Sequence, residues 1–413
     1  MRLSTSIYLH VFHLLLLICH SCDAFSPQTF GDVPFWYALI KPQYRNSPGF
    51  NDAFSDAIST VETNSALRYT AVAADLGTFF YVFQAEKEKA SRIQQQFAIN
   101  CDVFNEYTEA LEISDPEADN ESYPPHLQLP DSKNQVPDAN ITSIIGVPLT
   151  YRPSGWDLHM LSMPPGARLP NYGYYYRKPS GQNVTIYVID SGANLNHKEF
   201  DGLRARDLVR EWIWAGPFPA TGQQRDPHPH AHGTKVLASI AGQRAGVVEN
   251  SDIIIVQQRD SNGNFTLLNT ISALTQTYTS IRQKRKEDKI VVNFSWGVGN
   301  VIEARNDQLY NALRDIISAL HDLPNVILVC RAVTEKSGIA SGYPALLADI
   351  LPKLVIVGGI DRDGRKSSDC GPAVTAFAPA VDILSPAEWS NTEYKLVAGS
   401  SHGKQCKIYM LDQ

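Results

Sequence analysis

The feature that most constrains the fold is a series of short, β-branched apolar runs in the second half of the chain. They lie at 184–189, 252–256, 290–294, 326–329 and 354–357. None alternates strictly between apolar and polar residues, which is typical of strands covered on both faces and hence of a parallel sheet. Segments of helical composition separate them, at 233–243, 267–285 and 306–320. The pattern predicts a three-layer α/β domain with active groups at the carboxyl ends of its strands.

The region from 25 to 112 follows a different pattern. Strand-like and helix-like segments alternate there, at 36–40, 50–62, 78–83 and 87–97. A small α+β region is therefore predicted. The stretch 113–143 is acidic and rich in proline, which is typical of a linker. We expect the α/β domain to occupy residues 144–413.

The first 24 residues have the features of a secretory leader. Arg2 precedes the apolar run 11–18, and the segment 22–24 ends it with small residues of the kind that a signal peptidase reads. The apolar run is far shorter than the roughly 20 residues that a membrane-spanning helix needs. We expect a secreted, extracellular protein with no membrane association after removal of the leader.

The number of cysteines and the triplets for N-glycosylation are compatible with secretion. The cysteines after the leader are too sparse for a disulfide scaffold and leave one or two bridges open, among Cys101, Cys330, Cys370 and Cys406. Triplets for N-glycosylation suit a glycoprotein surface, at Asn120, Asn140, Asn183 and Asn264. A further triplet at Asn293 falls within a strand run and is expected to stay unmodified.

The net charge of -7 provides no basic surface for nucleic acid.

The first candidate group for chemistry is a carboxylate. The run 184–189 leads directly into Asp190-Ser191-Gly192, so the carboxylate stands at the carboxyl end of a strand beside residues that permit a sharp turn. An acid in that place can orient a histidine. The same triplet is also typical of a turn or a helix cap.

The second candidate is His232, which begins a segment of helical spacing. If Asp190 reaches it, the carboxylate fixes the imidazole tautomer and leaves the other ring nitrogen free to accept a proton. Two alternatives stay open: a surface histidine, and a metal-binding tract with His228 and His230. Their alternating spacing lacks the pattern of usual metal sites, so no metal is expected.

The third candidate is a hydroxyl near the end of the sequence. Gly399-Ser400-Ser401 follows a strand end at 377–379, and either serine can act as a nucleophile if it lies against His232. By itself Gly-Ser-Ser is equally a common loop sequence.

In this order the motifs resemble the subtilisin-like serine peptidases, the subtilase family. The resemblance covers about 184–401 and includes further motifs at 292–297, 342–344, 357–361 and 378–379. It implies a subtilisin-like fold in which Asp190 orients, His232 is the general base and Ser401 is the nucleophile.

The same resemblance implies a role for two other regions. Ser295-Trp296-Gly297 matches the family's Ser-Leu-Gly strand, which binds extended peptide through backbone hydrogen bonds, with Trp296 bulkier than the usual leucine. The region 25–112 is similar, more loosely, to the family's inhibitory propeptide. A stable accessory domain is the alternative.

Two departures from the family pattern count against activity. Val333 stands where the family has an asparagine that donates to the oxyanion, and whether Arg331 or Thr334 replaces that donor is open. Losing one such donor typically costs about 10²–10³ in turnover. After Ser401 the family continues with a long buried helix, whereas this sequence has only the polar segment 402–413. We expect the C-terminal part of the domain to be missing from the chain as given, as in a premature end.

Together these observations predict a secreted serine endopeptidase, active on polypeptides through an acyl-enzyme and needing no cofactor. A monomer is expected, and structural calcium is not supported by the sequence. The alternative is a catalytically inactive subtilase-fold binding protein. An ester or lipid hydrolase is excluded because that class places its serine before the acid and the histidine.

Overall fold

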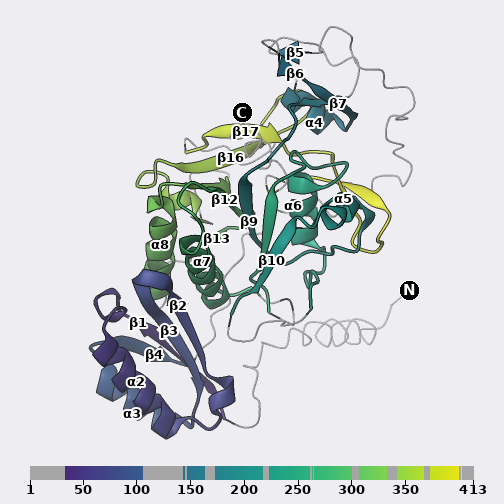
Figure 1. The fold of residues 1–413 in the computed structure, drawn as a ribbon. Helices are drawn as coiled ribbons and strands as arrows, with labels where there is room; N and C mark the ends of the chain where they lie inside the picture. Colours follow the sequence, from purple (N-terminus) through teal and green to yellow (C-terminus); the bar gives the residue numbers. More distant parts are fainter. Residues whose placement is uncertain are drawn as a thin grey trace, which may run out of the picture. The chain divides into compact units, whose positions relative to one another are not determined.

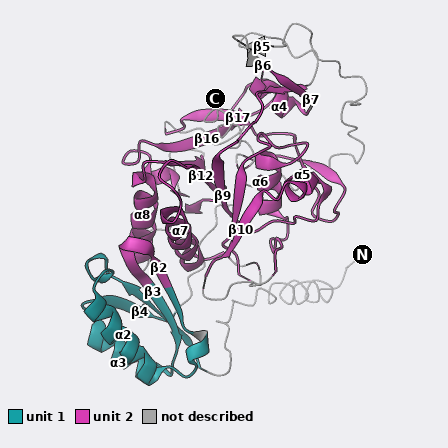
Figure 2. Cartoon of the chain, viewed as in Figure 1, with its two compact units in different colours: residues 1–70, 80–107 teal, residues 71–79, 108–413 magenta. Residues whose placement is uncertain are grey.

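The computed structural model describes residues 33–105, 143–144, 147–162, 173–216, 223–260, 263, 265–299, 307–332, 342–366, 373–399 and 401. Its contacts divide the chain into two compact units, one of residues 1–70 and 80–107 and the other of residues 71–79 and 108–413 (Figure 2). The predicted leader at 1–24 and residues 113–142 of the predicted linker 113–143 lie outside the described residues, whereas Ser143 begins the short strand β5 (Ser143–Ile144).

The region 33–105 contains an antiparallel sheet and two helices, and its residues 71–79 are the part that is counted with the larger unit. Its sheet has the strand order β2-β3-β1-β4, and β1 pairs antiparallel with both β3 and β4. The elements are β1 (Phe35–Ile40), α2 (Pro48–Val61), β2 (Tyr69–Ala73), β3 (Gly77–Gln84), α3 (Lys87–Phe97) and β4 (Cys101–Phe104). The α+β architecture predicted for this region is confirmed. Sequence analysis missed β2 and β4, which are short.

Local chemistry explains where α2 begins. The Ser47 side chain accepts a hydrogen bond from the Phe50 amide, and Pro48 occupies the first helical position, where its missing N–H costs nothing. One face of this helix buries Phe54 and Ile58, which pack with Phe97 of α3 and with the sheet. The smaller unit therefore has a hydrophobic core of its own.

The larger unit is built around a seven-stranded parallel sheet. The strand order is β10-β11-β9-β12-β14-β16-β17, and every neighbouring pair is parallel. The strands are β9 (Val184–Asp190), β10 (Val209–Trp214), β11 (Asp252–Gln257), β12 (Lys289–Phe294), β14 (Val326–Arg331), β16 (Leu354–Ile360) and β17 (Ala376–Pro379). The α/β prediction is confirmed. Edge strand β10 was missed because Arg210 and Glu211 interrupt its apolar pattern.

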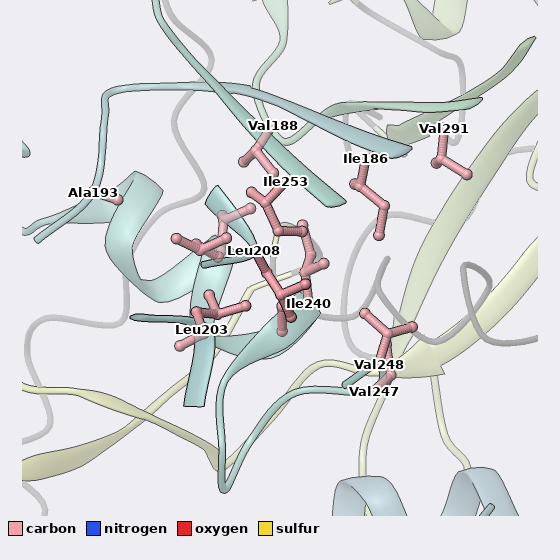
Figure 3. Close-up of a cluster of buried hydrophobic side chains, with 14 of the residues drawn as sticks. Ile186, Val188, Ala193, Leu203, Leu208, Ile240, Val247, Val248, Ile253 and Val291 are labelled. Carbon is pink, nitrogen blue, oxygen red and sulfur yellow. The ribbon is translucent and has the colours of Figure 1, made fainter. Parts of the chain in front are cut away.

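Helices cover both faces of this sheet (Figure 1). The main ones are α5 (Asp201–Ala205), α6 (His232–Ala241), α7 (Leu267–Arg282) and α8 (Asp307–Asp322). Figure 3 shows the core on one face, where Ile186 and Val188 of β9 belong to the same buried cluster as Leu203 of α5 and Ile240 of α6. Burial of these aliphatic side chains contributes about 1.5–3 kcal/mol each and holds α6 against the sheet.

The strand order creates a switch point beside β9. The chain passes from β9 to β10 and β11 on one side, then crosses to β12 on the other. At the carboxyl ends, Phe294 of β12 is level with Ile189 of β9 and with Cys330 of β14. The next residue along each of these three strands therefore comes to one edge, which is where ligands bind in open parallel sheets.

Shorter elements complete the larger unit. They are β5 (Ser143–Ile144), β6 (Val147–Pro148), β7 (Thr150–Pro153), α4 (Trp156–Ser162), β8 (Gly173–Tyr176), β13 (Val298–Gly299), β15 (Gly342–Tyr343), β18 (Ile383–Pro386) and β19 (Tyr394–Val397). Strands β18 and β19 form an antiparallel hairpin. After it, the Gly399 amide donates to the Ala380 carbonyl at 2.7 Å, which ties the chain down just before Ser401. Within the described ranges, none of the helices is long and apolar enough to cross a membrane.

Candidate active site

Asp190 ends β9 at the carboxyl edge of the sheet and is 2% exposed. Its Oδ1 accepts hydrogen bonds from the Ser191 amide at 2.7 Å and from His232 Nδ1 at 2.8 Å. Burial by itself would raise the pKa of Asp190, but the charge of His232 and these two hydrogen bonds hold that pKa below its ordinary value. The carboxylate is therefore ionised at neutral pH.

His232 is the first residue of α6, so the helix delivers its ring to the sheet edge. Because Nδ1 donates to Asp190, Nε2 is the ring nitrogen that carries the lone pair. The structure thus brings together Asp190 and His232, the two residues that the sequence singled out as an acid and a base.

Ser191 links the Asp190 carboxylate to the first turn of α6. Its Oγ accepts a hydrogen bond from the Gly233 amide at 2.8 Å and donates to Asp190 Oδ1 at 3.2 Å. The first turn of α6 lies so close to the β9 loop that a Cβ at position 233 would stand 2.2 Å from the Gly192 carbonyl oxygen. Glycine is the only residue that fits there.

The loop before α6 supplies a second carboxyl group. Asp226 accepts hydrogen bonds from the amide and the hydroxyl of Thr234, each at 2.8 Å, and from the His228 amide at 3.1 Å. These bonds satisfy an amide in the first turn of α6, which the helix itself cannot pair. Burial raises the pKa of Asp226. Asp226 therefore fixes the helix that carries His232.

The predicted histidine tract lies beside the acid and the base. The rings of His228 and His232 are 5.9 Å apart between centroids, and those of His228 and His230 are 5.7 Å apart. Burial, with the charge of Arg259, lowers the pKa of His228 to about 3, so this ring is neutral. No group of three or more potential metal ligands is found in the part of the chain that the structure describes.

Ser401 is fully buried and lies against the ends of two strands. Its Oγ donates to the Ser295 carbonyl oxygen at 3.0 Å, and Arg331 Nη1 donates to this Oγ at 3.2 Å. The Ser295 hydroxyl in turn donates to the Ser401 carbonyl at 3.4 Å. Asp190, Ser295 and Arg331 stand at neighbouring positions along the carboxyl edge of β9, β12 and β14. Ser401 is therefore placed at this edge, while Ser400 lies outside the described residues.

The segment Ser295-Trp296-Gly297, predicted to bind peptide, is buried. Ser295 and Trp296 are 0% and 1% exposed, respectively. The indole of Trp296 packs against Phe294 with ring centroids 5.5 Å apart and against Phe265 at 6.0 Å. Peptide binding by this segment stays a prediction.

The remaining predictions concern the oxyanion position, the C-terminal segment, the cysteines and the glycosylation triplets, and the structure describes only some of these residues. Val333, Thr334 and the segment 402–413 lie outside the described residues, as do Cys370, Cys406 and the asparagines of three glycosylation triplets, Asn120, Asn140 and Asn264. Of the rest, Asn183 is exposed and Asn293 is fully buried on β12. Cys101 and Cys330 are buried free thiols.

Sequence reasoning missed part of this site. The contact of Arg331 with Ser401 was left open, although a charged residue that ends the apolar strand β14 is itself a signal. Asp226 was passed over because it precedes the histidine tract in a proline-rich loop. No local pattern separates such a buried carboxyl from an ordinary loop aspartate.

Fold and site together define a parallel α/β protein whose carboxyl edge carries the hydrogen-bonded pair of Asp190 and His232 and also a buried serine, Ser401. The model of the subtilase family matches residues 181–411. The chain belongs to the subtilase family.

Three named proteins are similar to this chain. Subtilisin-like protease 3 of Pseudogymnoascus destructans is 28% identical over 282 residues, covering 68% of this chain and 62% of that protein. Alkaline protease 1 of Aspergillus flavus is 29% identical over 232 residues, covering 55% and 51%, respectively. A crystal structure of a cold adapted subtilisin-like serine proteinase matches with a TM-score of 0.46 and 25% identity, over 62% of this chain and 82% of that one. The chain thus spans less than two thirds of the length of these two curated relatives.

Proposed function

We propose that this protein is a secreted serine endopeptidase that acts on polypeptides as a monomer and without a cofactor. The observation that carries the proposal is the buried Asp190 carboxylate at 2.8 Å from His232 Nδ1, on the sheet edge that also bears Ser401. His232 Nε2 accepts the proton of Ser401 Oγ, which attacks the peptide carbonyl. The amine leaves with that proton, and water hydrolyses the acyl-enzyme.

The predicted secretory leader and the exposed Asn183, which begins a glycosylation triplet, support an extracellular location. In this proposal the α+β region at 25–112 is a propeptide, and Ser295 to Gly297 pair with extended substrate. The Ser295 carbonyl accepts a hydrogen bond from the Ser401 hydroxyl at 3.0 Å, and its second lone pair is the one that a substrate amide would use.

A second candidate function is that of an inactive subtilase-fold binding protein. It is favoured by the same hydrogen bond from Ser401 Oγ to the Ser295 carbonyl, together with the burial of Ser295 and Trp296. In that arrangement the hydroxyl proton is directed at a carbonyl oxygen, which cannot remove it.

A fluorophosphonate probe separates the two functions. The full chain is incubated with the probe beside Ser401→Ala, and both are checked for folding by near-ultraviolet circular dichroism. A peptidase is labelled in the wild type only, and loses about 10⁴-fold or more of its turnover in the variant. Folded wild-type protein that takes up no label would show the inactive form.

A further inference from the structure

Arg331 is an unusual residue for its place in the fold. It ends β14, whose other members are apolar, and the side chain is only 2% exposed. Taking a guanidinium out of water costs several kcal/mol unless hydrogen bonds and charge compensate it. An arginine buried within a parallel sheet therefore requires a partner or a task that a smaller apolar residue cannot provide.

The guanidinium is directed at the serine of the site. Arg331 Nη1 lies 3.2 Å from Ser401 Oγ and donates to it, while this Oγ donates to the carbonyl at the end of β12. Register places Arg331 level with Ser295, since Cys330 pairs with Phe294. The sheet thus holds the backbone of Arg331, and its guanidinium reaches the atom that performs the attack.

We infer that Arg331 is a catalytic residue that donates to the oxyanion, a role that rests on the proposed peptidase function. As Oγ bonds to the substrate carbonyl carbon, the carbonyl π electrons move to its oxygen and the Oγ proton goes to His232. The oxyanion is bonded to the same carbon as Oγ, so a donor already within hydrogen-bonding distance of Oγ is within reach of it. A guanidinium has five N–H groups and serves both oxygens.

The positive charge of Arg331 strengthens the hydrogen bond that its position allows it to donate to the oxyanion. A donor aimed at developing charge in a site that excludes water is worth about 10²–10³ in rate, and a charge-assisted hydrogen bond is roughly twice as strong as a neutral one. Arg331 therefore takes over the donation that Val333, at the position of the family's asparagine, cannot make.

The test compares Arg331→Met, Arg331→Gln and Arg331→Lys with the wild type and with Ser401→Ala. Two quantities are measured on the full chain: the second-order rate of fluorophosphonate labelling, and kcat and KM for fluorescently labelled casein. The probe reports on the donor because its phosphonyl oxygen gains charge as the Oγ–P bond forms and fluoride leaves. Arg152→Met is the matched control, since Arg152 donates to the carbonyls of Gln243 and Gly246, away from Ser401.

Arg331→Met is expected to lower both the labelling rate and kcat by about 10²–10³. KM should stay near that of the wild type, and Arg152→Met should keep the wild-type labelling rate. If labelling requires Ser401 but folded Arg331→Met is labelled at the wild-type rate, the role of Arg331 is overturned. The peptidase proposal would still stand in that case. Wild-type protein that takes up no label overturns both.

A structural role for Arg331 gives a different pattern. If Arg331→Met does not fold, Arg331→Lys and Arg331→Gln decide, because the first keeps the charge and the second keeps only a neutral donor. We expect Arg331→Lys to react about tenfold faster than Arg331→Gln. Equal rates in these two folded variants would show that Arg331 only anchors the Ser401 segment, and the inference would be lost.

Discussion

The two halves of the site are held in different ways. Asp190 and His232 are 42 positions apart, with α5 and β10 between them in the chain, and are hydrogen-bonded where the end of β9 meets the start of α6. Ser401 bonds to Ser295 and Arg331, which lie 106 and 70 positions away on two other strands. The acid–imidazole half therefore depends on local packing, whereas the nucleophile half depends on assembly of the whole sheet. Variants that affect one half at a time test this difference.

The largest effect should come from Asp190→Asn. The amide keeps the size of the carboxylate but no longer fixes the His232 tautomer, so turnover should fall by about 10⁴. Fluorophosphonate labelling rates measure this change, and near-ultraviolet circular dichroism should match the wild type because the sheet is unaltered. Asp201→Asn, an exposed carboxylate on α5, is the control and should react normally. Labelling of Asp190→Asn at the wild-type rate would mean that the pair does not act in the chemistry.

An intermediate effect is expected from Gly233→Ala. The new Cβ would stand 2.2 Å from the Gly192 carbonyl, so the start of α6 must shift and move the His232 ring. A displacement of about 1 Å costs roughly 10²-fold in rate, with about 1–3 kcal/mol of lost stability from overpacking. Casein turnover and urea unfolding measure the two losses.

Gly202→Ala is the matched control for that variant. A Cβ at position 202 meets only the far end of the Arg206 side chain, at 3.2 Å, which can move away. If both variants lose activity to the same extent, the close contact between α6 and the β9 loop is not what positions His232.

The smallest effect is on the pH dependence of folding stability, through His228, whose ring lies beside that of His232. The pKa of His228 is lowered from 6.5 to about 3, so between these values the unfolded chain binds a proton there that the folded chain does not. Folding stability from this group is therefore present above pH 6.5 and declines as the pH falls toward 3. His228→Gln should lose less stability between pH 7 and pH 5 than the wild type, as measured by urea unfolding. An identical pH dependence would show that the ring is not kept neutral.

The sequence predicted some parts of the molecule well. The β-branched runs became β9, β11, β12, β14 and β16, because burial on both faces demands apolar residues along the whole strand. Asp190 and His232 were found as candidates since each adjoins a strong local pattern, a strand end and a helix start. The edge strand β10 was missed because two exposed charged residues, Arg210 and Glu211, interrupt its apolar pattern.

By itself, the sequence determined the layers of the larger unit, the α+β architecture of the smaller one and the family, because periodicity and ordered motifs are local properties of the chain. Only the tertiary structure decided that Arg331 meets Ser401 and that Asp226 holds the first turn of α6. Strand order and register bring distant residues to one edge, and they follow from how the strands assemble across the switch point beside β9. No local pattern encodes that assembly.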